Sequence, residues 1–145
     1  RYYRGGGAFV GEVSQPNILF DSTLPRQYGT GWYTFSTWIY VDVDRLATGF
    51  FHIEEYDAQS GERLQEQHYR IYDHFRTFDS NGWALVEMGF IPQRSDSRIR
   101  FWVDNQDIGE APLFVDELLI RHDIAEIYQK GQHYLFKNNR WYPVE

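Results

Sequence analysis

The first residues that could do chemistry are three glutamates in strand-like segments: Glu54, Glu55 and Glu87. Two carboxylates can hydrolyse a glycosidic bond when they lie roughly 5–9 Å apart and one of them has a raised pKa. The sequence establishes neither condition. We therefore interpret these glutamates as groups that hydrogen-bond a ligand or carry solvated charge, and we expect no glycosidase activity.

The histidines are not spaced like the ligands of a metal site. None of the five follows an HxH or HExxH pattern, which are the spacings that bring imidazoles to one metal ion. The chain also contains no cysteine, which excludes disulfides, thiol nucleophiles and cysteine-ligated metals.

The charge balance excludes further classes of partner. The formal net charge is −7, and nucleic acids and anionic membranes both attract basic surfaces. No apolar run approaches the ~18 residues that would cross a membrane. We therefore expect neither nucleic-acid binding nor membrane insertion.

Aromatic residues are the unusual part of the composition. They make up 19% of the 145 residues, as 11 Tyr, 11 Phe and 5 Trp. The length fits one domain with one core, and we interpret residues 1–145 as a single module of a larger protein. Aromatic residues in excess of what such a core needs are typical of β-sandwiches and of flat binding surfaces.

The aromatic and β-branched residues fall into short runs separated by Gly, Asp, Ser, Asn and Pro, which predicts strands joined by tight turns. Turns are predicted at 57–61, 79–82 and 92–97. No helix is predicted, although residues 124–130 fit either a short helical turn or another strand. Many antiparallel strands without helices predict a two-sheet sandwich or a barrel. The expected strands are Ala8–Val13, Asn17–Phe20, Gly31–Val43, Gly49–Asp57, Arg63–Tyr72, Trp83–Ile91, Arg98–Asp104 and Leu113–Ile120.

Alternation along each strand separates an inner face from an outer face. In "GWYTFSTWIYVDV" (Gly31–Val43) one face carries Tyr33 and Phe35, and the other carries Trp38 and Tyr40. We assign the first face to the core because other strands show equally apolar sets. The phase of Arg63–Tyr72 stays open. The remaining expected core residues are Ile39, Val41, Phe51, Ile53, Ala84, Val86, Met88, Phe90, Ile99, Phe101 and Val103.

The outward residues mix aromatic rings with polar and charged groups. If their strands are neighbours, they form one face suited to sugar, because rings stack on the C–H face of a pyranose and planar polar groups bond its hydroxyls. The alternative is that the rings pack beneath a loop or a terminal segment. The expected glycan-binding residues are Trp38, Tyr40, Tyr56, Tyr69 and Trp102 for stacking, and Glu54, Gln67, Glu87 and Arg100 for hydrogen bonds.

Four motifs between Gly31 and Ile120 resemble, in order, the strands of jelly-roll carbohydrate-binding modules related to families 4, 9 and 22. These are "GWYTFSTWIYV", "FFHIEEYDAQSGERL", "GWALVEMGFIP" and "IGEAPLFVDELLI". The resemblance implies an all-β, antiparallel two-sheet jelly-roll β-sandwich of the galactose-binding-like type. The segment before Gly31 lacks the opening motif of these modules, and the tail extends beyond their last strand.

The same resemblance implies a structural Ca²⁺ ion. Asp116 in "FVDELLI" aligns with an aspartate that often ligates Ca²⁺ in these modules, and Glu12 together with loop carbonyls would complete the oxygen ligands that such a hard cation requires. The alternative is that Asp116 only accepts backbone N–H groups at a strand edge.

A second, weaker resemblance concerns the tail. "YQKGQHY" (Tyr128–Tyr134) resembles the "Y-x-K-A-G-x-Y" strand of alginate lyases, and "QEQH" (Gln65–His68) partly matches their "Q-I-H" motif. A lyase would need Tyr, His and Arg to converge on an acidic sugar, and the rest of the chain does not align with that family.

We therefore predict a non-catalytic accessory module of an extracytoplasmic protein. It would bind carbohydrate or polysaccharide weakly and contact other domains of its parent protein. The alternative is a structural or docking domain of a secreted or membrane-anchored carbohydrate-active enzyme, either a glycosyltransferase or a hydrolase.

Overall fold

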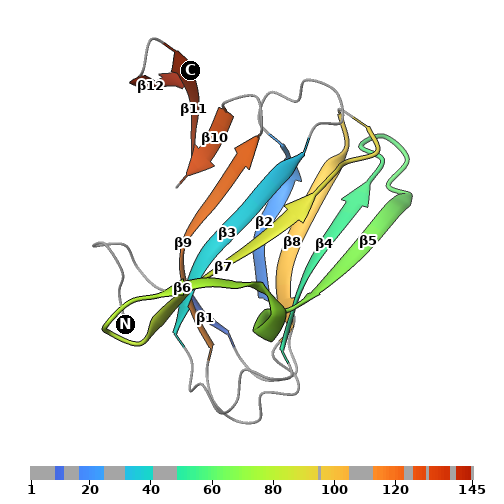
Figure 1. Cartoon of the computed structure of the whole chain (residues 1–145). Helices are drawn as coiled ribbons and strands as arrows, with labels where there is room; N and C mark the ends of the chain where they lie inside the picture. Colours follow the sequence, from blue (N-terminus) through green and yellow to red (C-terminus); the bar gives the residue numbers. More distant parts are fainter. Residues whose placement is uncertain are drawn as a thin grey trace.

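The computed structural model describes residues 9–11, 17–24, 32–40, 49–94, 96–104, 113–122, 126–129, 131–137 and 140–144 (Figure 1). Strand follows strand through these ranges, interrupted by one 3₁₀ turn, η2 (Ile71–His74). The strands are β1 (Phe9–Gly11), β2 (Asn17–Thr23), β3 (Tyr33–Tyr40), β4 (Phe50–Tyr56), β5 (Arg63–Arg70), β6 (Phe75–Phe78), β7 (Trp83–Phe90), β8 (Arg98–Asp104), β9 (Leu113–His122), β10 (Glu126–Gln129), β11 (Gln132–Lys137) and β12 (Arg140–Val144).

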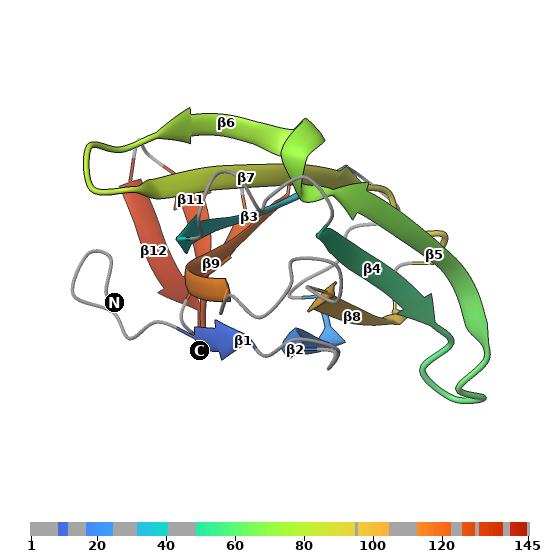
Figure 2. The same ribbon diagram turned by 90° about the horizontal axis from the view of Figure 1, so that it is seen from below.

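The strands form two antiparallel sheets. The large sheet has the order β12-β11-β10-β9-β3-β7-β6, and β1 also pairs with β9. The small sheet has the order β2-β8-β4-β5. The two layers are separate in Figure 2, and Figure 1 shows that β10, β11 and β12 extend the large sheet beyond the small one. The predicted all-β class with two antiparallel sheets is confirmed.

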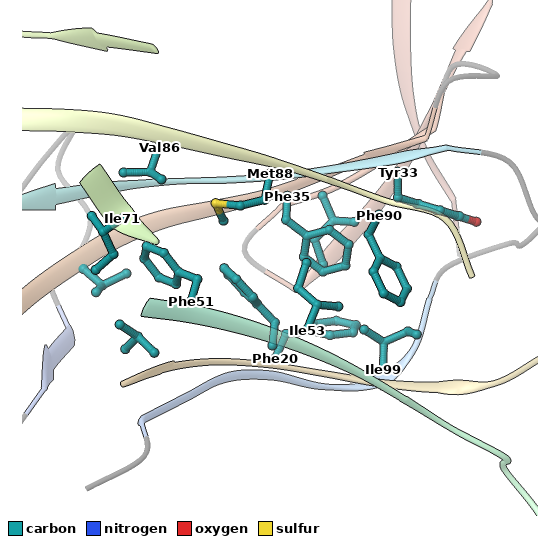
Figure 3. Close-up of a cluster of buried hydrophobic side chains, with 14 of the residues drawn as sticks. Phe20, Tyr33, Phe35, Phe51, Ile53, Ile71, Val86, Met88, Phe90 and Ile99 are labelled. Atoms are coloured by element: carbon teal, nitrogen blue, oxygen red, sulfur yellow. The ribbon is translucent and has the colours of Figure 1, made fainter. Parts of the chain in front are cut away.

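The core lies between the two sheets, where the predicted inner faces meet. Phe35 of the large sheet contacts Phe101 of the small sheet with a ring-centroid separation of 5.3 Å, and Phe51 stacks on Phe101 at the same distance. Figure 3 shows Phe35, Met88 and Phe90 pointing from one sheet toward Phe51 and Ile53 of the other. The predicted core residues that the structure describes are all buried; Val41 lies outside the described residues.

The strand predictions are confirmed for most of the chain, with ends that differ by a few residues. Arg98–Asp104 has the predicted bounds, whereas β5 ends at Arg70 because η2 follows it directly. The residues after η2 form the short edge strand β6, and the tail adds β10, β11 and β12. β10 confirms the strand alternative for residues 124–130. The prediction lacks β6, β11 and β12, because each is short and most of their residues are polar or exposed.

The predicted turn at residues 57–61 joins β4 to β5. The Asp57 carboxylate accepts hydrogen bonds from the backbone N–H groups of Gln59 and Ser60 at 2.9 and 2.8 Å, and Gly61 adopts a positive φ of 75°. A side-chain carboxylate that binds N–H groups two and three residues ahead stabilises a tight turn. The prediction of a hairpin at this position is therefore confirmed, and its residue types explain it.

The buried carboxylate of Glu55 holds the loop that follows β7. Glu55 is fully buried. It accepts hydrogen bonds from the backbone N–H groups of Gln93 (2.8 Å) and Arg94 (3.1 Å), from Ser97 Oγ (2.6 Å) and from Gln65 Nε2 (2.7 Å). Because every donor points at one charged group, the carboxylate replaces the water that these groups would otherwise bind.

The Glu55→Gln variant should lower the free energy of unfolding by about 3 kcal/mol, because the new amide NH₂ faces the donors that the carboxylate accepted. Urea denaturation monitored by fluorescence measures this change. Glu62→Gln in the exposed 57–62 turn is the matched control and should change stability by less than about 0.5 kcal/mol. Equal effects of the two substitutions would contradict the anchoring role of Glu55.

Candidate functional site

A pocket opens on the outer face of the large sheet. Its volume is about 200 Å³. β3 forms its floor, while β7 lies on one side and β9 and β10 lie on the other. The pocket combines one aromatic ring with two leucines, two carboxylates, a guanidinium and an amide. Its lining residues are Ser36, Trp38, Leu85, Glu87, Glu117, Leu119, Arg121 and Gln129.

A β-bulge in β9 shapes one wall of this pocket. Ser36 pairs with Leu119, but Trp38 pairs with Asp116, so β9 has one more residue than β3 in this interval. Glu117 occupies the bulge with a φ of 58°, and Thr37 Oγ1 donates a 2.9 Å hydrogen bond to the Asp116 carbonyl. A bulge redirects side chains, and this one lets Glu117 reach the same face as Leu119.

The charged groups in the pocket are mutually engaged. The two oxygens of Glu87 face Arg76 Nε at 3.5 Å and Arg121 Nη2 at 3.4 Å. On the opposite wall, Gln129 Nε2 donates a 3.0 Å hydrogen bond to Glu117 Oε1. These contacts fix the orientations of both carboxylates, so that a ligand would meet a preformed set of polar groups.

Two further aromatic residues flank the pocket along β3. Tyr40 packs edge-on against the buried Trp83, with ring centroids 5.5 Å apart. Trp32, at the other end, lies directly over Gly89: a Cβ at that glycine would come within 1.8 Å of the indole. Glycine therefore lets Trp32 lie against the sheet, while 48% of the Trp32 surface remains exposed.

The outer face of the small sheet carries a different cluster, centred on stacked rings. His52 stacks on Trp102 with centroids 3.9 Å apart, and its Nδ1 lies 2.6 Å from Nδ1 of His68. Trp102 Nε1 donates a 3.1 Å hydrogen bond to Glu54. Burial and the nearby His68 lower the pKa of His52, while burial and a hydrogen bond with Glu66 raise the pKa of Glu54. Most of the polar atoms in this cluster thus contact one another.

Arginines cover the rest of that face. Arg98 Nε donates a 2.6 Å hydrogen bond to Asp21, and Arg100 lies 3.4 Å from the same carboxylate. The hydrogen bond from Arg98 is the main reason that the pKa of Asp21 lies below its usual value. Arg100 also lies over the ring of Tyr56, 5.5 Å from its centroid, which is within the range of a cation–π contact.

The structure divides the predicted glycan-binding residues among three places, so the expectation of one continuous face is wrong. Trp38, Tyr40 and Glu87 lie on the outer face of the large sheet, because β3 pairs with β7. Their predicted companions lie on the opposite side of the sandwich, because β4 and β8 belong to the small sheet. Those companions are Glu54, Tyr56, Arg100 and Trp102.

Gln67 and Tyr69 occupy the third place, on the inner side of β5. Tyr69 pairs with the buried Phe51 and Gln67 pairs with Ile53, so both leave the sheet on the core side. The hydroxyl of Tyr69 donates a 2.6 Å hydrogen bond to the Gly89 carbonyl of the large sheet. Tyr69 therefore joins the two sheets and does not share a face with Trp102.

The three glutamates considered for hydrolysis also lie apart. Glu54 belongs to the cluster on the small sheet, Glu55 anchors the loop after β7, and Glu87 lines the pocket. Likewise, Tyr128 of the lyase-like motif packs on the core against Phe20, while His68 lies on the outer face of the small sheet. Neither the three glutamates nor the residues of the lyase-like segments come together in one site.

The predicted calcium site is only partly described. Asp116 is buried opposite Trp38, and Glu12 lies outside the described residues. Within the part of the chain that the structure describes, no three His, Asp or Glu side chains are grouped to hold a metal ion. The proposed pair of ligands stays a prediction.

The prediction missed most of the pocket residues. Ser36 and Leu85 are on the predicted outward face, but small or aliphatic residues give no binding signal on their own. The bulge reverses the alternation of β9 after Asp116, and the sequence leaves residues 124–130 open between a helical turn and a strand. Alternation along a strand therefore could not group residues of β9 and β10 with Trp38. The missed residues are Ser36, Leu85, Glu117, Leu119, Arg121 and Gln129.

Comparison with family models, with curated proteins and with solved structures gives no match. Among the described residues, no helix is long and apolar enough to cross a membrane.

Tyr69 supplies a test of how the two sheets are joined. Burial raises its pKa to about 12, above the ordinary value near 10. The buried hydroxyl stays protonated while the unfolded chain ionises, so stability should fall as the pH rises from about 10 to about 12. Tyr69→Phe should remove this part of the alkaline loss and should cost about 1 kcal/mol at neutral pH through the lost hydrogen bond.

Thermal unfolding measured from pH 7 to pH 12 checks both effects. Tyr72→Phe is the matched control, because Tyr72 is 60% exposed on η2. If Tyr69→Phe and Tyr72→Phe gave the same pH profile, Tyr69 would not titrate as a buried group.

Proposed function

We propose that the outer face of the large sheet binds a neutral glycan, and that the chain is a non-catalytic carbohydrate-binding module. The observation that carries this proposal is the pocket beside Trp38, in which an aromatic ring, aliphatic side chains and oriented polar groups surround one concave site. A pyranose ring has the same division, with an apolar C–H face and an equatorial rim of hydroxyls.

Each part of the pocket has a role in this proposal. The indole of Trp38 stacks on the C–H face of one sugar ring, while Leu85 and Leu119 exclude water from its edges. Glu87 and Glu117 accept hydrogen bonds from hydroxyl groups, which are stronger to a charged acceptor than to a neutral one. Arg121, on the wall beside Leu119, donates to ring or hydroxyl oxygens.

The charges favour a neutral sugar over an acidic one. Arg76 and Arg121 are both engaged by Glu87, and Glu117 adds a second carboxylate. Two carboxylates and one guanidinium line the pocket, so a uronate or a sulfate group would meet an excess of negative charge, on a chain whose net charge is −7. Uncharged hexose or pentose units avoid this repulsion.

Trp32 supports binding of a chain rather than of a single sugar. Trp32, which directly precedes β3, lies over Gly89, and Trp38 lies six residues further along, which corresponds to about 20 Å along a strand. Gly89 lies beneath the ring of Trp32, and the small side chain of Ser36 keeps the surface beside Trp38 low. A linear glycan lying along β3 contacts both indoles. Because such a site gains little beyond a few stacked rings, its dissociation constant should lie between micromolar and millimolar.

The remaining parts of the proposal rest on the resemblance of the sequence motifs. They are a jelly-roll connection of the galactose-binding-like type, a structural Ca²⁺ bound by Asp116 and Glu12, and an accessory role in an extracytoplasmic protein. The two antiparallel sheets are compatible with this type of sandwich.

Trp38→Ala should abolish retardation in affinity gels that contain hydroxyethylcellulose, xylan or galactomannan, because it removes the stacking platform. The expected loss of affinity is at least tenfold. Trp102→Ala is the matched control: it removes a stacked tryptophan from the opposite side of the sandwich and should leave retardation unchanged. Polygalacturonate gels test the preference for neutral polymers and should retard the protein weakly or not at all.

The results distinguish three readings of the aromatic residues. Binding that is lost in Trp102→Ala and kept in Trp38→Ala would move the site to the small sheet. Absence of retardation in every gel would favour the alternative, in which the pocket is covered by another domain of the parent protein. Retardation by polygalacturonate alone would overturn the assignment to neutral sugars.

A further inference from the structure

We propose that Glu117 determines which sugars this pocket binds, and that the strained backbone that places its carboxylate there lowers the stability of the fold. The inference rests on the proposed glycan-binding function. Glu117 would accept hydrogen bonds from hydroxyl groups on the sugar ring that stacks on Trp38.

The first support is the backbone of Glu117. Its φ of 58° lies in the left-handed region, where a side chain crowds the following carbonyl and the conformation is unfavourable for residues other than glycine. Among the described residues, the other positive φ values belong to Gly61, Gly82 and Gly131. Strained conformations of this kind persist when the surrounding structure enforces them, and they are concentrated at functional sites.

The second support is that the bulge does not need a glutamate side chain. The hydrogen bond that secures it runs from Thr37 Oγ1 to the backbone carbonyl of Asp116. Backbone pairing on both sides of the extra residue, of Ser36 with Leu119 and of Trp38 with Asp116, holds the bulge in place. Glycine would fit this backbone conformation with less strain, so the bulge itself does not explain a glutamate at residue 117.

The third support is where the side chain lies. Glu117 and Trp38 line the same pocket, and their backbones are adjacent because Trp38 pairs with the residue that precedes Glu117. Gln129 on β10 donates to Glu117 Oε1 and fixes the orientation of the carboxylate. A ring stacked on Trp38 therefore presents its rim of hydroxyls to a carboxylate that is already held in place, which limits the entropy lost on binding.

This arrangement predicts that stability and binding change in opposite directions. Glu117→Gly relieves the backbone strain, which should outweigh the loss of the hydrogen bond from Gln129 and raise Tm by about 2 °C. Its affinity for the neutral polysaccharide that binds the wild type most strongly in the gels above should weaken at least tenfold. Glu117→Gln keeps a side chain at the strained position, so its Tm should stay close to that of the wild type, yet binding should weaken similarly because the charged acceptor is lost.

Gly61→Ala is the matched control for strain. Gly61 has a φ of 75° and no atom lies within 4 Å of an added Cβ, so the substitution introduces left-handed strain without a clash. It lies in the turn between β4 and β5, on the other sheet. Its Tm should fall by a few degrees while its binding stays unchanged. Differential scanning calorimetry and affinity electrophoresis on the same four proteins measure both quantities.

The outcomes separate this inference from the proposed function. If the wild type is not retarded by any neutral polysaccharide, the proposed function fails and the role of Glu117 fails with it. If Trp38→Ala loses binding while Glu117→Gln retains it, the pocket binds glycan but Glu117 does not determine its specificity. A fall in Tm for Glu117→Gly would show that the glutamate is kept for the fold and would overturn the inference.

Discussion

The contact of Phe101 with Phe35 and Phe51 is the constraint on which the remaining structure depends. It places one ring from each sheet in the same layer, so the alternating residues of β3, β4 and β8 must turn outward. With 27 aromatic residues in the chain, the core cannot hold them all. The outward positions therefore receive rings as well, and the neighbours of each ring decide whether it is covered or available.

The two outer faces differ in whether their tryptophan rings are covered. On the small sheet, Trp102 is covered by His52 and bonded to Glu54, so its polar and aromatic groups stabilise one another. On the large sheet, Trp38 borders a pocket whose floor is lowered by Ser36. The same residue classes thus form a closed cluster on one side of the protein and a pocket on the other, which is why we propose the pocket as the place where glycan binds.

The alternation of residues along a strand predicts which side chains share a face of that strand. It does not predict which strands are neighbours in a sheet. The buried sets of β3, β7 and β8 follow directly from alternation. The grouping of Trp38 with Trp102 was wrong because alternation gives the face of a strand but not the sheet to which it belongs. Glu117 could not be found, because one extra residue in β9 changes the phase of all that follow. The short polar strands of the tail give too weak a pattern to assign.

The extension formed by β10, β11 and β12 has a consequence for how the molecule opens. These strands continue the large sheet past the edge of the small one, and the ring of Tyr128 packs against Phe20 of the central core. Among the described residues of these strands, Tyr128 is the one that packs on the hydrophobic core. We therefore expect the three strands to form a cooperative unit that opens more often than the sandwich, with faster amide hydrogen exchange. Gln129 belongs to this unit, and each opening would release its hold on the carboxylate of Glu117. The rate at which a bound sugar leaves the proposed site would then depend on how often β10, β11 and β12 open.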